Sequence, residues 1–274
     1  MAQSLSNDKN IVLIKIMQVN IKSFLDENLN TSFVGRQIYY YSSLPSTMEK
    51  ARELAREGVE EGTTIITETQ TSGRGRLGRI WLSPKGNLAI SIILKPAINN
   101  LPKLVMIGSL AVVRAIKNVT GIDAQIKWPN DVLIRSKKIC GILIENEVKG
   151  NKVNFAILGI GMNVNLKPEL FPDISDIATS LLYEMGREVS RNDFSYVLLS
   201  ELENLYLKFG DGNSIFDEWK EKIETLGKQV QVKIGDTIKY GKAESVRDNG
   251  NLILRHYDGG FSEISSGDII APDD

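Results

Sequence analysis

The densest group of chemically active residues is 73–79, Gly-Arg-Gly-Arg-Leu-Gly-Arg, in which three arginines are interleaved with three glycines. Guanidinium groups bind phosphate and carboxylate oxygens through paired hydrogen bonds, and glycine lets backbone amides approach a ligand closely. The segment is either an anion-binding loop or a loop that is only solvated, and its glycines favour the first interpretation. It is not a Walker loop, because neither Lys-Ser nor Lys-Thr follows the glycines, and their spacing does not fit a dinucleotide fingerprint.

Residues 127–131, Lys-Trp-Pro-Asn-Asp, combine a cation, an aromatic ring and two short acceptor side chains where a strand turns. They form either part of a ligand site or an ordinary β-turn in which Asn130 and Asp131 bond their own backbone. Lys138 precedes an apolar strand. It is either a surface charge or a cation placed to stabilise charge that develops on a phosphoryl or acyl oxygen.

Two further glycines, Gly159 and Gly161, interrupt an apolar strand pattern shortly before Asn163. Glycine inside a strand marks either a β-bulge or a place where a ligand or another backbone comes close. The residues alone leave both interpretations open.

The composition excludes several kinds of chemistry. The 33 basic and 34 acidic residues give a net charge of -1, so no global field attracts nucleic acid or an anionic membrane. Cys140 and His256 are the only residues of their types, which excludes a disulfide framework and paired histidine ligands. No apolar stretch reaches the roughly 20 residues that span a bilayer, and residues 11–17 lack the features of a signal peptide. We expect a soluble cytoplasmic protein that binds neither nucleic acid nor membrane.

The chain before the arginine loop predicts a helix over residues 47–57. Ser46 and Glu49 have the spacing of a capping box, in which Ser46 accepts from the amide three residues on and Glu49 reaches back. Gly58 is expected to end this helix.

Alternating apolar and β-branched residues predict further strands, and the short connections of the later ones force an antiparallel meander. These strands are expected at 63–69, 87–95, 126–128, 132–134, 139–148 and 153–164. Helical spacing predicts helices at 102–118, 192–209 and 215–226, of which the last two are expected to pack on the sheet. A strand at 11–17 and a helix at 19–29 complete the prediction.

From Lys228 onward the pattern changes to short β segments separated by the tight-turn sequences 248–250, Asp-Asn-Gly, and 258–260, Asp-Gly-Gly. The fold class is therefore α+β, with a mixed, mainly antiparallel sheet, packed helices and a small C-terminal barrel. The predicted units are a short N-terminal appendage at 1–35, a main domain at 36–226 and the barrel at 227–274.

The order and spacing of these segments resemble those of the biotin protein ligase family over roughly residues 38–270. The matching segments are 46–47, 70–79, 81, 127–131, 138–141 and 159–163. The resemblance implies a class II synthetase-like catalytic domain that binds biotin and ATP, followed by an SH3-like barrel. It also implies ATP- and magnesium-dependent formation of biotinyl-5'-AMP, transfer of biotin to a specific lysine of a biotin carboxyl carrier protein, and a homodimer.

Roles follow from the resemblance residue by residue. Those implied for biotin are Ser46, Thr47, Gln70, Gly73, Arg74, Lys138, Gly141, Gly159 and Gly161. Those implied for ATP and the adenylate are Arg76, Arg79, Trp81, Lys127, Asn130, Asp131 and Asn163. The catalytic set is Lys138, Arg76, Arg79 and Asp131. No metal site made by the protein alone is expected, since magnesium would enter with the phosphates, near Asp131.

Two features depart from the family. Met48 stands where the family usually has asparagine, so no polar contact is assigned there. Larger members carry an N-terminal DNA-binding domain, for which residues 1–35 leave no room, so no repressor function is expected.

Three alternatives remain. A lipoate or octanoate protein ligase shares the fold, but the arginine loop and the C-terminal barrel disfavour it. An RNA-binding protein is disfavoured by the net charge and the lack of an extended basic stripe. A biotin sensor without catalysis is disfavoured by the intact Lys138 and three arginines.

Overall fold

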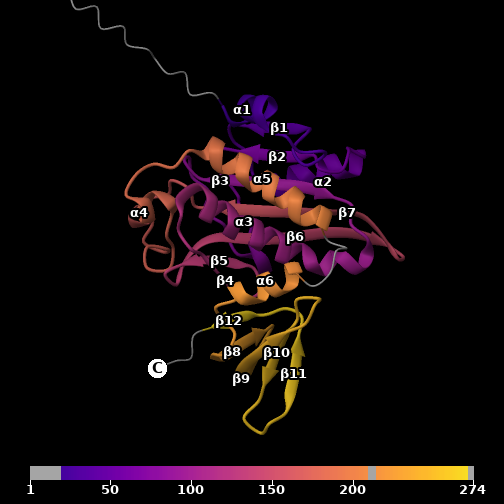
Figure 1. The fold of residues 1–274 in the computed structure, drawn as a ribbon, viewed down its shortest axis with the longest axis vertical. Coiled ribbons are helices and arrows are strands. Elements are labelled where there is room, and N and C mark those ends of the chain that lie inside the picture. The colour runs from indigo at the N-terminus through magenta and orange to yellow at the C-terminus, as the bar shows by residue number, and fades with distance from the viewer. Residues whose placement is uncertain (1–19, 209–213, 271–274) are drawn as a thin grey trace, which may run out of the picture.

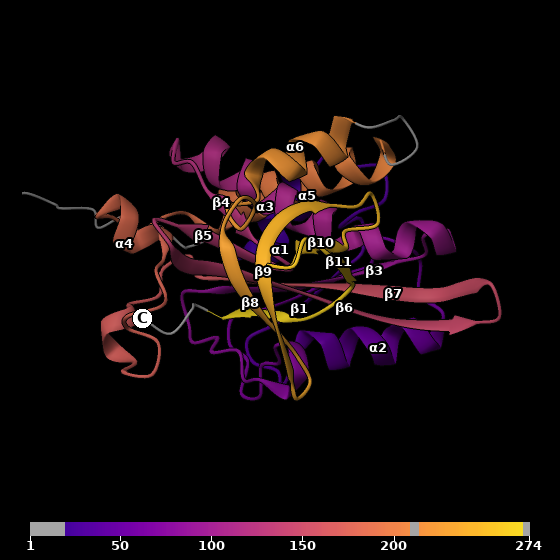
Figure 2. The ribbon, with the colours of Figure 1, turned by 90° about the horizontal axis from the view of Figure 1, so that it is seen from below.

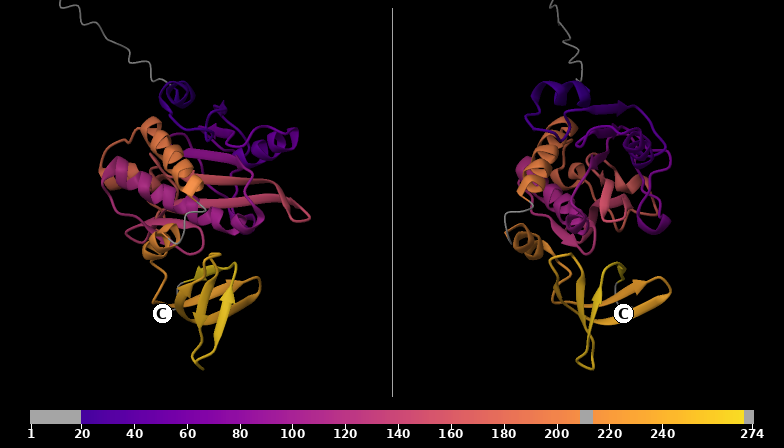
Figure 3. Two further views of the ribbon diagram at one scale, coloured as in Figure 1. Left: turned by 45° about the vertical axis from the view of Figure 1, so that its right-hand side comes forward. Right: turned by 90° about the vertical axis from the view of Figure 1, so that its right-hand side faces the viewer.

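The computed structural model describes residues 20–208 and 214–270. They form a large sheet with its helices and a smaller sheet beyond it (Figures 1 and 3). The predicted α+β class is confirmed, whereas the strand expected at 11–17 lies outside the described residues. Among the described residues, no helix has the length and apolar character needed to cross a bilayer.

The large sheet has seven strands in the order β1-β2-β3-β7-β6-β5-β4. Among these strands only β1 and β2 run parallel, and the other neighbours are antiparallel. For β4 to β7, the short connections require this. The strands are β1 (Ile38–Tyr41), β2 (Thr64–Thr67), β3 (Leu88–Leu94), β4 (Gln125–Lys127), β5 (Asp131–Ile134), β6 (Lys137–Lys149) and β7 (Lys152–Met162). The edge strand β1 was not predicted, because its Ile-Tyr-Tyr-Tyr sequence shows no alternation.

Helices cover both faces of this sheet (Figure 2). On one face lies α2 (Thr47–Glu57), which agrees with the predicted bounds and buries Met48, Ala51 and Leu54 against the sheet. On the other lies α3 (Leu104–Thr120), which is buried around most of its circumference, as expected of an internal helix.

The remaining helices are α1 (Ile21–Asn28), α4 (Leu181–Met185), α5 (Arg191–Leu207) and α6 (Ser214–Lys222). Our prediction that the segment 192–209 packs on the sheet is wrong in its main contact, because α5 packs chiefly on α3, and α1 packs on α5. Helix α6 also contacts α3, but the end of its predicted segment 215–226 is not helical and pairs with β4, where the amide of Glu224 donates to the carbonyl of Ile126 at 2.9 Å. Amphipathic spacing identifies the buried side of a helix but not the element that covers it.

The second sheet has five antiparallel strands in the order β11-β10-β9-β8-β12. They are β8 (Gln229–Ile234), β9 (Thr237–Val246), β10 (Leu252–Arg255), β11 (Phe261–Ile264) and β12 (Asp268–Ile270). The predicted tight turns are present, and Gly250 and Gly259 adopt positive φ values of 85° and 87° there. The arrangement agrees with the expected SH3-like barrel. It touches the main sheet where Nε1 of Trp128 donates to the carbonyl of Gly250 at 2.9 Å.

The anchoring of α6 to α3 supplies a test of the helical layer. Trp219 is fully buried, and its Nε1 donates to Oγ of Ser109 at 3.2 Å. Trp219→Ala should lower the free energy of unfolding by about 3–5 kcal/mol, because it opens a cavity in the core. Trp219→Phe, which keeps a ring but loses the donor, should cost clearly less. Urea denaturation measures both, and equal losses would contradict the packing role.

Candidate active site

A cavity of about 120 Å³ opens over β6 and β7, where three of the singled-out glycines lie. Its walls come from the N-terminus of α2, the arginine loop, the β4–β5 turn and the second sheet. Of the residues predicted for the site, those that line it are Thr47, Gln70, Arg74, Arg76, Arg79, Trp81, Asn130, Asp131, Lys138, Gly141, Gly159 and Gly161.

The glycines make the floor of the cavity flat. Gly141 and Gly161 are directly paired in the ladder, and a Cβ atom at Gly161 would overlap the indole of Trp81. A Cβ atom at Gly159 would overlap the sulfur of Met48. The β6–β7 register is continuous at these positions, so close approach, and not a bulge, explains both glycines of β7.

The N-terminus of α2 forms the end of the cavity around Thr47. The backbone amide of Thr47 donates to Oε1 of Gln70 at 2.9 Å, and Oγ of Ser91 donates to Oγ1 of Thr47 at 2.8 Å. These two contacts fix a polar corner beside the apolar floor.

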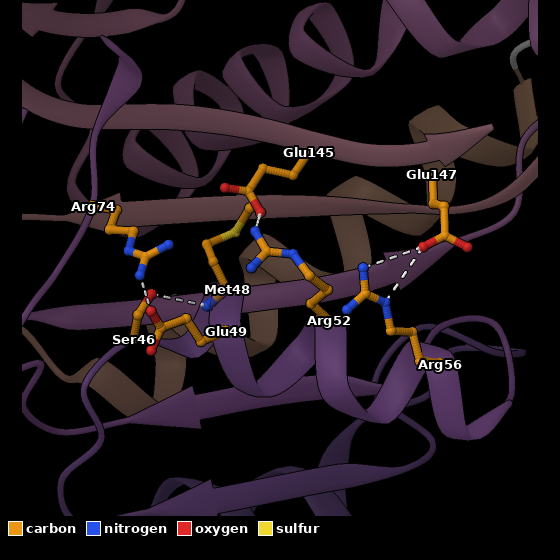
Figure 4. Close-up of polar contacts among 8 residues, drawn as sticks. All are labelled: Ser46, Met48, Glu49, Arg52, Arg56, Arg74, Glu145 and Glu147. Atoms are coloured by element: carbon orange, nitrogen blue, oxygen red, sulfur yellow. Dashed lines mark hydrogen bonds and ion pairs between the residues drawn. The ribbon is translucent and has the colours of Figure 1, made fainter. Parts of the chain in front are cut away.

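The predicted capping box is only half formed. Oγ of Ser46 accepts from the amide of Met48, two residues on, and Glu49 pairs with Arg74 of the loop instead of reaching back (Figure 4). Glu49 pairs with Arg74 because the tertiary structure brings the loop close to the first turn of α2. A capping-box motif describes local contacts only, so it could not predict this pair.

The arginine loop is an ordered turn. Its ends are joined by hydrogen bonds from the amide of Gly75 to the carbonyl of Arg79 at 2.7 Å and from Trp81 to Gly73 at 2.9 Å. Leu77 at its tip has a left-handed φ of 54°. A Cβ atom at Gly73 would overlap the carbonyl of Trp81, so this glycine serves the closure of the turn.

All three arginines contact other parts of the chain, so the interpretation of a merely solvated loop is wrong. Arg74 pairs with Glu49. Arg76 donates to Oδ1 of Asn130 at 2.9 Å, and its side chain is only 19% exposed. Burial lowers the pKa of Arg76, and the nearby charge of Asp268 offsets only part of that shift. The guanidinium nevertheless stays protonated, because arginine does not lose its proton in proteins.

The turn at 127–131 also does more than bond its own backbone. Nδ2 of Asn130 donates to the carbonyl of Ile142 at 2.8 Å, while its Oδ1 accepts from Arg76. Oδ1 of Asp131 lies 2.8 Å from Nζ of Lys138, an ion pair without the alignment of a hydrogen bond. The same Nζ lies 5.5 Å from the ring centre of Trp81. Lys138 therefore faces the cavity and is not a surface charge.

Four predicted residues lie outside the cavity wall. Ser46 caps α2, and Gly73 closes the loop. Lys127 is on β4, where Ile126 and Trp128 on either side of it are buried. Oδ1 of Asn163 accepts from Asn87, and its Nδ2 donates to Thr179. The side chains of Ser46 and Asn163 and the backbone of Gly73 thus support the frame of the site and not its wall.

Asp268 of β12 lines the cavity and was not predicted. It follows a Ser-Ser-Gly turn some 190 residues after the loop, with no local signal of a site. Its charge complementarity with Arg76 and Arg79 is visible only once the two sheets are assembled.

Comparison with known proteins agrees with this architecture. Residues 40–163 match the biotin/lipoate A/B protein ligase family. The bifunctional ligase/repressor BirA of Bacillus subtilis is 37% identical over 88% of this chain and 76% of its own length. The biotin acetyl-CoA-carboxylase ligase of Paracoccus denitrificans is 31% identical over 77% and 90%. The biotin protein ligase of Aquifex aeolicus, solved with biotin and ATP, superposes with a TM-score of 0.74 at 32% identity, covering 86% of this chain and 98% of that one.

The chain belongs to the biotin/lipoate A/B protein ligase family, in which its relatives are the biotin protein ligases. The chain is therefore an enzyme, a biotin protein ligase like these relatives.

The packing of Trp81 on Gly161 can be tested directly. Gly161→Ala should push the indole off the floor and lower the free energy of unfolding by about 1–3 kcal/mol, because the site is overpacked. Gly75→Ala, where the nearest atom would lie at 3.5 Å, should cost far less. Trp128 and Trp219 are buried, so a red-shifted component of tryptophan emission would report the exposed Trp81. An unchanged spectrum and stability would contradict the proposed contact.

Proposed function

We propose that this protein forms biotinyl-5'-AMP from biotin and ATP and then transfers the biotinyl group to a specific lysine of a biotin carboxyl carrier protein or domain. The observation that carries the proposal is one cavity with a flat apolar floor and four cations, Arg74, Arg76, Arg79 and Lys138, along its walls. It is supported by the relatives named above, one of which was solved with both substrates.

The first step needs this concentration of positive charge. The carboxylate of biotin attacks the α-phosphorus of ATP, so two anions must come together, and pyrophosphate leaves. Cations in a cavity with few competing waters offset that repulsion and stabilise the negative charge that builds up on the phosphoryl oxygens. Lys138, held between Asp131 and the ring of Trp81, is placed to contact both reacting groups.

The floor and the Thr47 corner fit the two parts of biotin. The glycine-lined strands offer flat apolar surface to its ring system, while Thr47 and Gln70 offer hydrogen-bonding groups to its cyclic urea. Trp81 covers this floor, and its buried Nε1 lacks a hydrogen-bond partner among the described residues. A buried unsatisfied donor costs free energy, so displacement of the indole by a ligand is favoured.

The second step requires a neutral lysine amine on the acceptor. Asp131 is the candidate base, since it is the carboxylate beside Lys138. Asn130 and Asp131 supply oxygen atoms of the kind that magnesium prefers, but Arg76 and Lys138 already engage them, so the ion would be held mainly by the phosphates. Magnesium bound there would neutralise phosphate charge.

The proposal extends to the acceptor, the assembly and the division of the chain. The acceptor is a domain of a biotin-dependent carboxylase, the enzyme is a homodimer, and the functional units are 1–35, 36–226 and 227–274. The relatives' names support the first.

The substrate can be tested without the carrier protein. Incubation with magnesium, ATP and biotin should yield biotinyl-AMP and pyrophosphate, detected by mass spectrometry and a coupled phosphate assay. Lipoate and octanoate serve as the competing substrates. If the protein consumed either of these acids and left biotin unreacted, it would be a lipoate or octanoate ligase of the same fold, and the proposed substrate would be wrong.

Lys138→Ala should cripple adenylate formation and leave the fold intact. Removing one group that stabilises developing charge typically slows a reaction by about 10²–10³-fold. Single-turnover kinetics measures the loss, and circular dichroism checks the fold. Lys137→Ala, at the neighbouring position of β6 and outside the cavity lining, is the matched control. Unimpaired turnover of Lys138→Ala would remove Lys138 from the mechanism.

A further inference from the structure

One carboxylate of the cavity is contributed by the C-terminal sheet. Asp268 is the first residue of β12, and its side chain is only 14% exposed. Its Oδ1 lies 3.8 Å from Nη1 of Arg76, and its Oδ2 accepts a hydrogen bond from Arg79. The carbonyl of Gly267 accepts from Arg76 at 3.3 Å. The second sheet thus holds the arginine loop by a carboxylate and a carbonyl.

Asp268 occupies guanidinium groups that could otherwise bind a phosphate group. Carboxylate and phosphate oxygens take the same paired hydrogen bonds from guanidinium groups, so both anions compete for the same donors. A fixed negative charge within a few ångströms of a bound phosphate also repels it.

We propose that Asp268 is an internal stand-in for the nucleotide phosphates, holding Arg76 and Arg79 in the ligand-free enzyme and releasing them when phosphate binds. Asp268 is in this sense a positioning residue that sets nucleotide affinity. The inference rests on the proposed function, since it concerns the ATP end of the same cavity.

The two arginines differ in how easily they can make the exchange. Arg76 keeps two other acceptors, Asn130 and the Gly267 carbonyl, and stays in place when the carboxylate is lost. Arg79 is 62% exposed and can turn toward a ligand by moving its side chain alone. The exchange therefore needs no rearrangement of the sheets.

Arg74 repeats the arrangement at the opposite end of the loop. Its guanidinium pairs with Glu49 on the first turn of α2 (Figure 4). Farther along the same helix, Arg52 and Arg56 pair with Glu145 and Glu147 of β6, away from the loop. All three guanidinium groups of the loop thus have a carboxylate partner, Glu49 for Arg74 and Asp268 for both Arg76 and Arg79.

The test compares the unsubstituted chain with Asp268→Asn, Asp268→Glu and Asp236→Asn. Asp236 is exposed in the turn between β8 and β9 and serves as a matched loss of charge from the same sheet. Calorimetry gives the Kd of inorganic pyrophosphate, steady-state kinetics gives KM for ATP and kcat separately, and trypsin reports the loop through cleavage after Arg76 and Arg79. Circular dichroism checks that each variant is folded.

Asp268→Asn should bind pyrophosphate about fivefold more tightly, with a matching fall in KM for ATP and no gain in kcat, because a competing charge is removed. Without ligand, its loop should be cut faster, and pyrophosphate should restore protection. Asp268→Glu and Asp236→Asn should resemble the wild type. Unchanged or weaker pyrophosphate binding by a folded Asp268→Asn would overturn the proposal. If the wild type forms no biotinyl-AMP, the proposed function fails, while the pyrophosphate comparison still decides the exchange.

Discussion

Mutual repulsion among four cations in one small cavity is the constraint around which the rest of the site is arranged. Arg74, Arg76, Arg79 and Lys138 converge there, and partly buried charges of one sign are unfavourable unless each has a counter-charge. Three carboxylates offset most of this charge: Glu49 of α2 pairs with Arg74, and Asp131 of β5 pairs with Lys138. Asp268 of β12 is shared by Arg76 and Arg79. Bringing these three elements to one loop requires the whole assembly of both sheets.

The floor of the cavity depends on a different property of the chain, the absence of side chains. Gly141, Gly159 and Gly161 leave strand backbone bare, so Trp81 and Met48 rest directly on it. Since Met48 stands where the family usually has asparagine, the wall above Gly159 is apolar in this chain. A rigid sheet with a bare face can receive a flat ligand once these two flexible side chains move aside.

Local signals explain which parts of the fold could be predicted. The helix at 47–57 has a cap, an apolar stripe and a terminal glycine, and its bounds were right. The edge strand β1 has none of these and was missed. The partners of Glu49 and Asp268 could not be predicted, because an ion pair between elements far apart in sequence leaves no local pattern. Arg76 and Lys138 were found because glycine spacing and the resemblance marked their surroundings.

The division between rigid and adjustable parts suggests how the enzyme handles a reactive anhydride. Asp131, Lys138 and the glycines belong to paired strands. The arginines and Trp81 belong to a turn that its own backbone hydrogen bonds close and that side-chain contacts of the arginines join to other elements. The cavity is small beside the roughly 300–1,000 Å³ of typical ligand sites, so binding must displace part of the loop. If protein carboxylates are exchanged for ligand anions during that movement, the arginines keep anionic partners in both states. In the proposed reaction, the loop would then open to admit substrates and close over the adenylate without a large electrostatic cost in either direction.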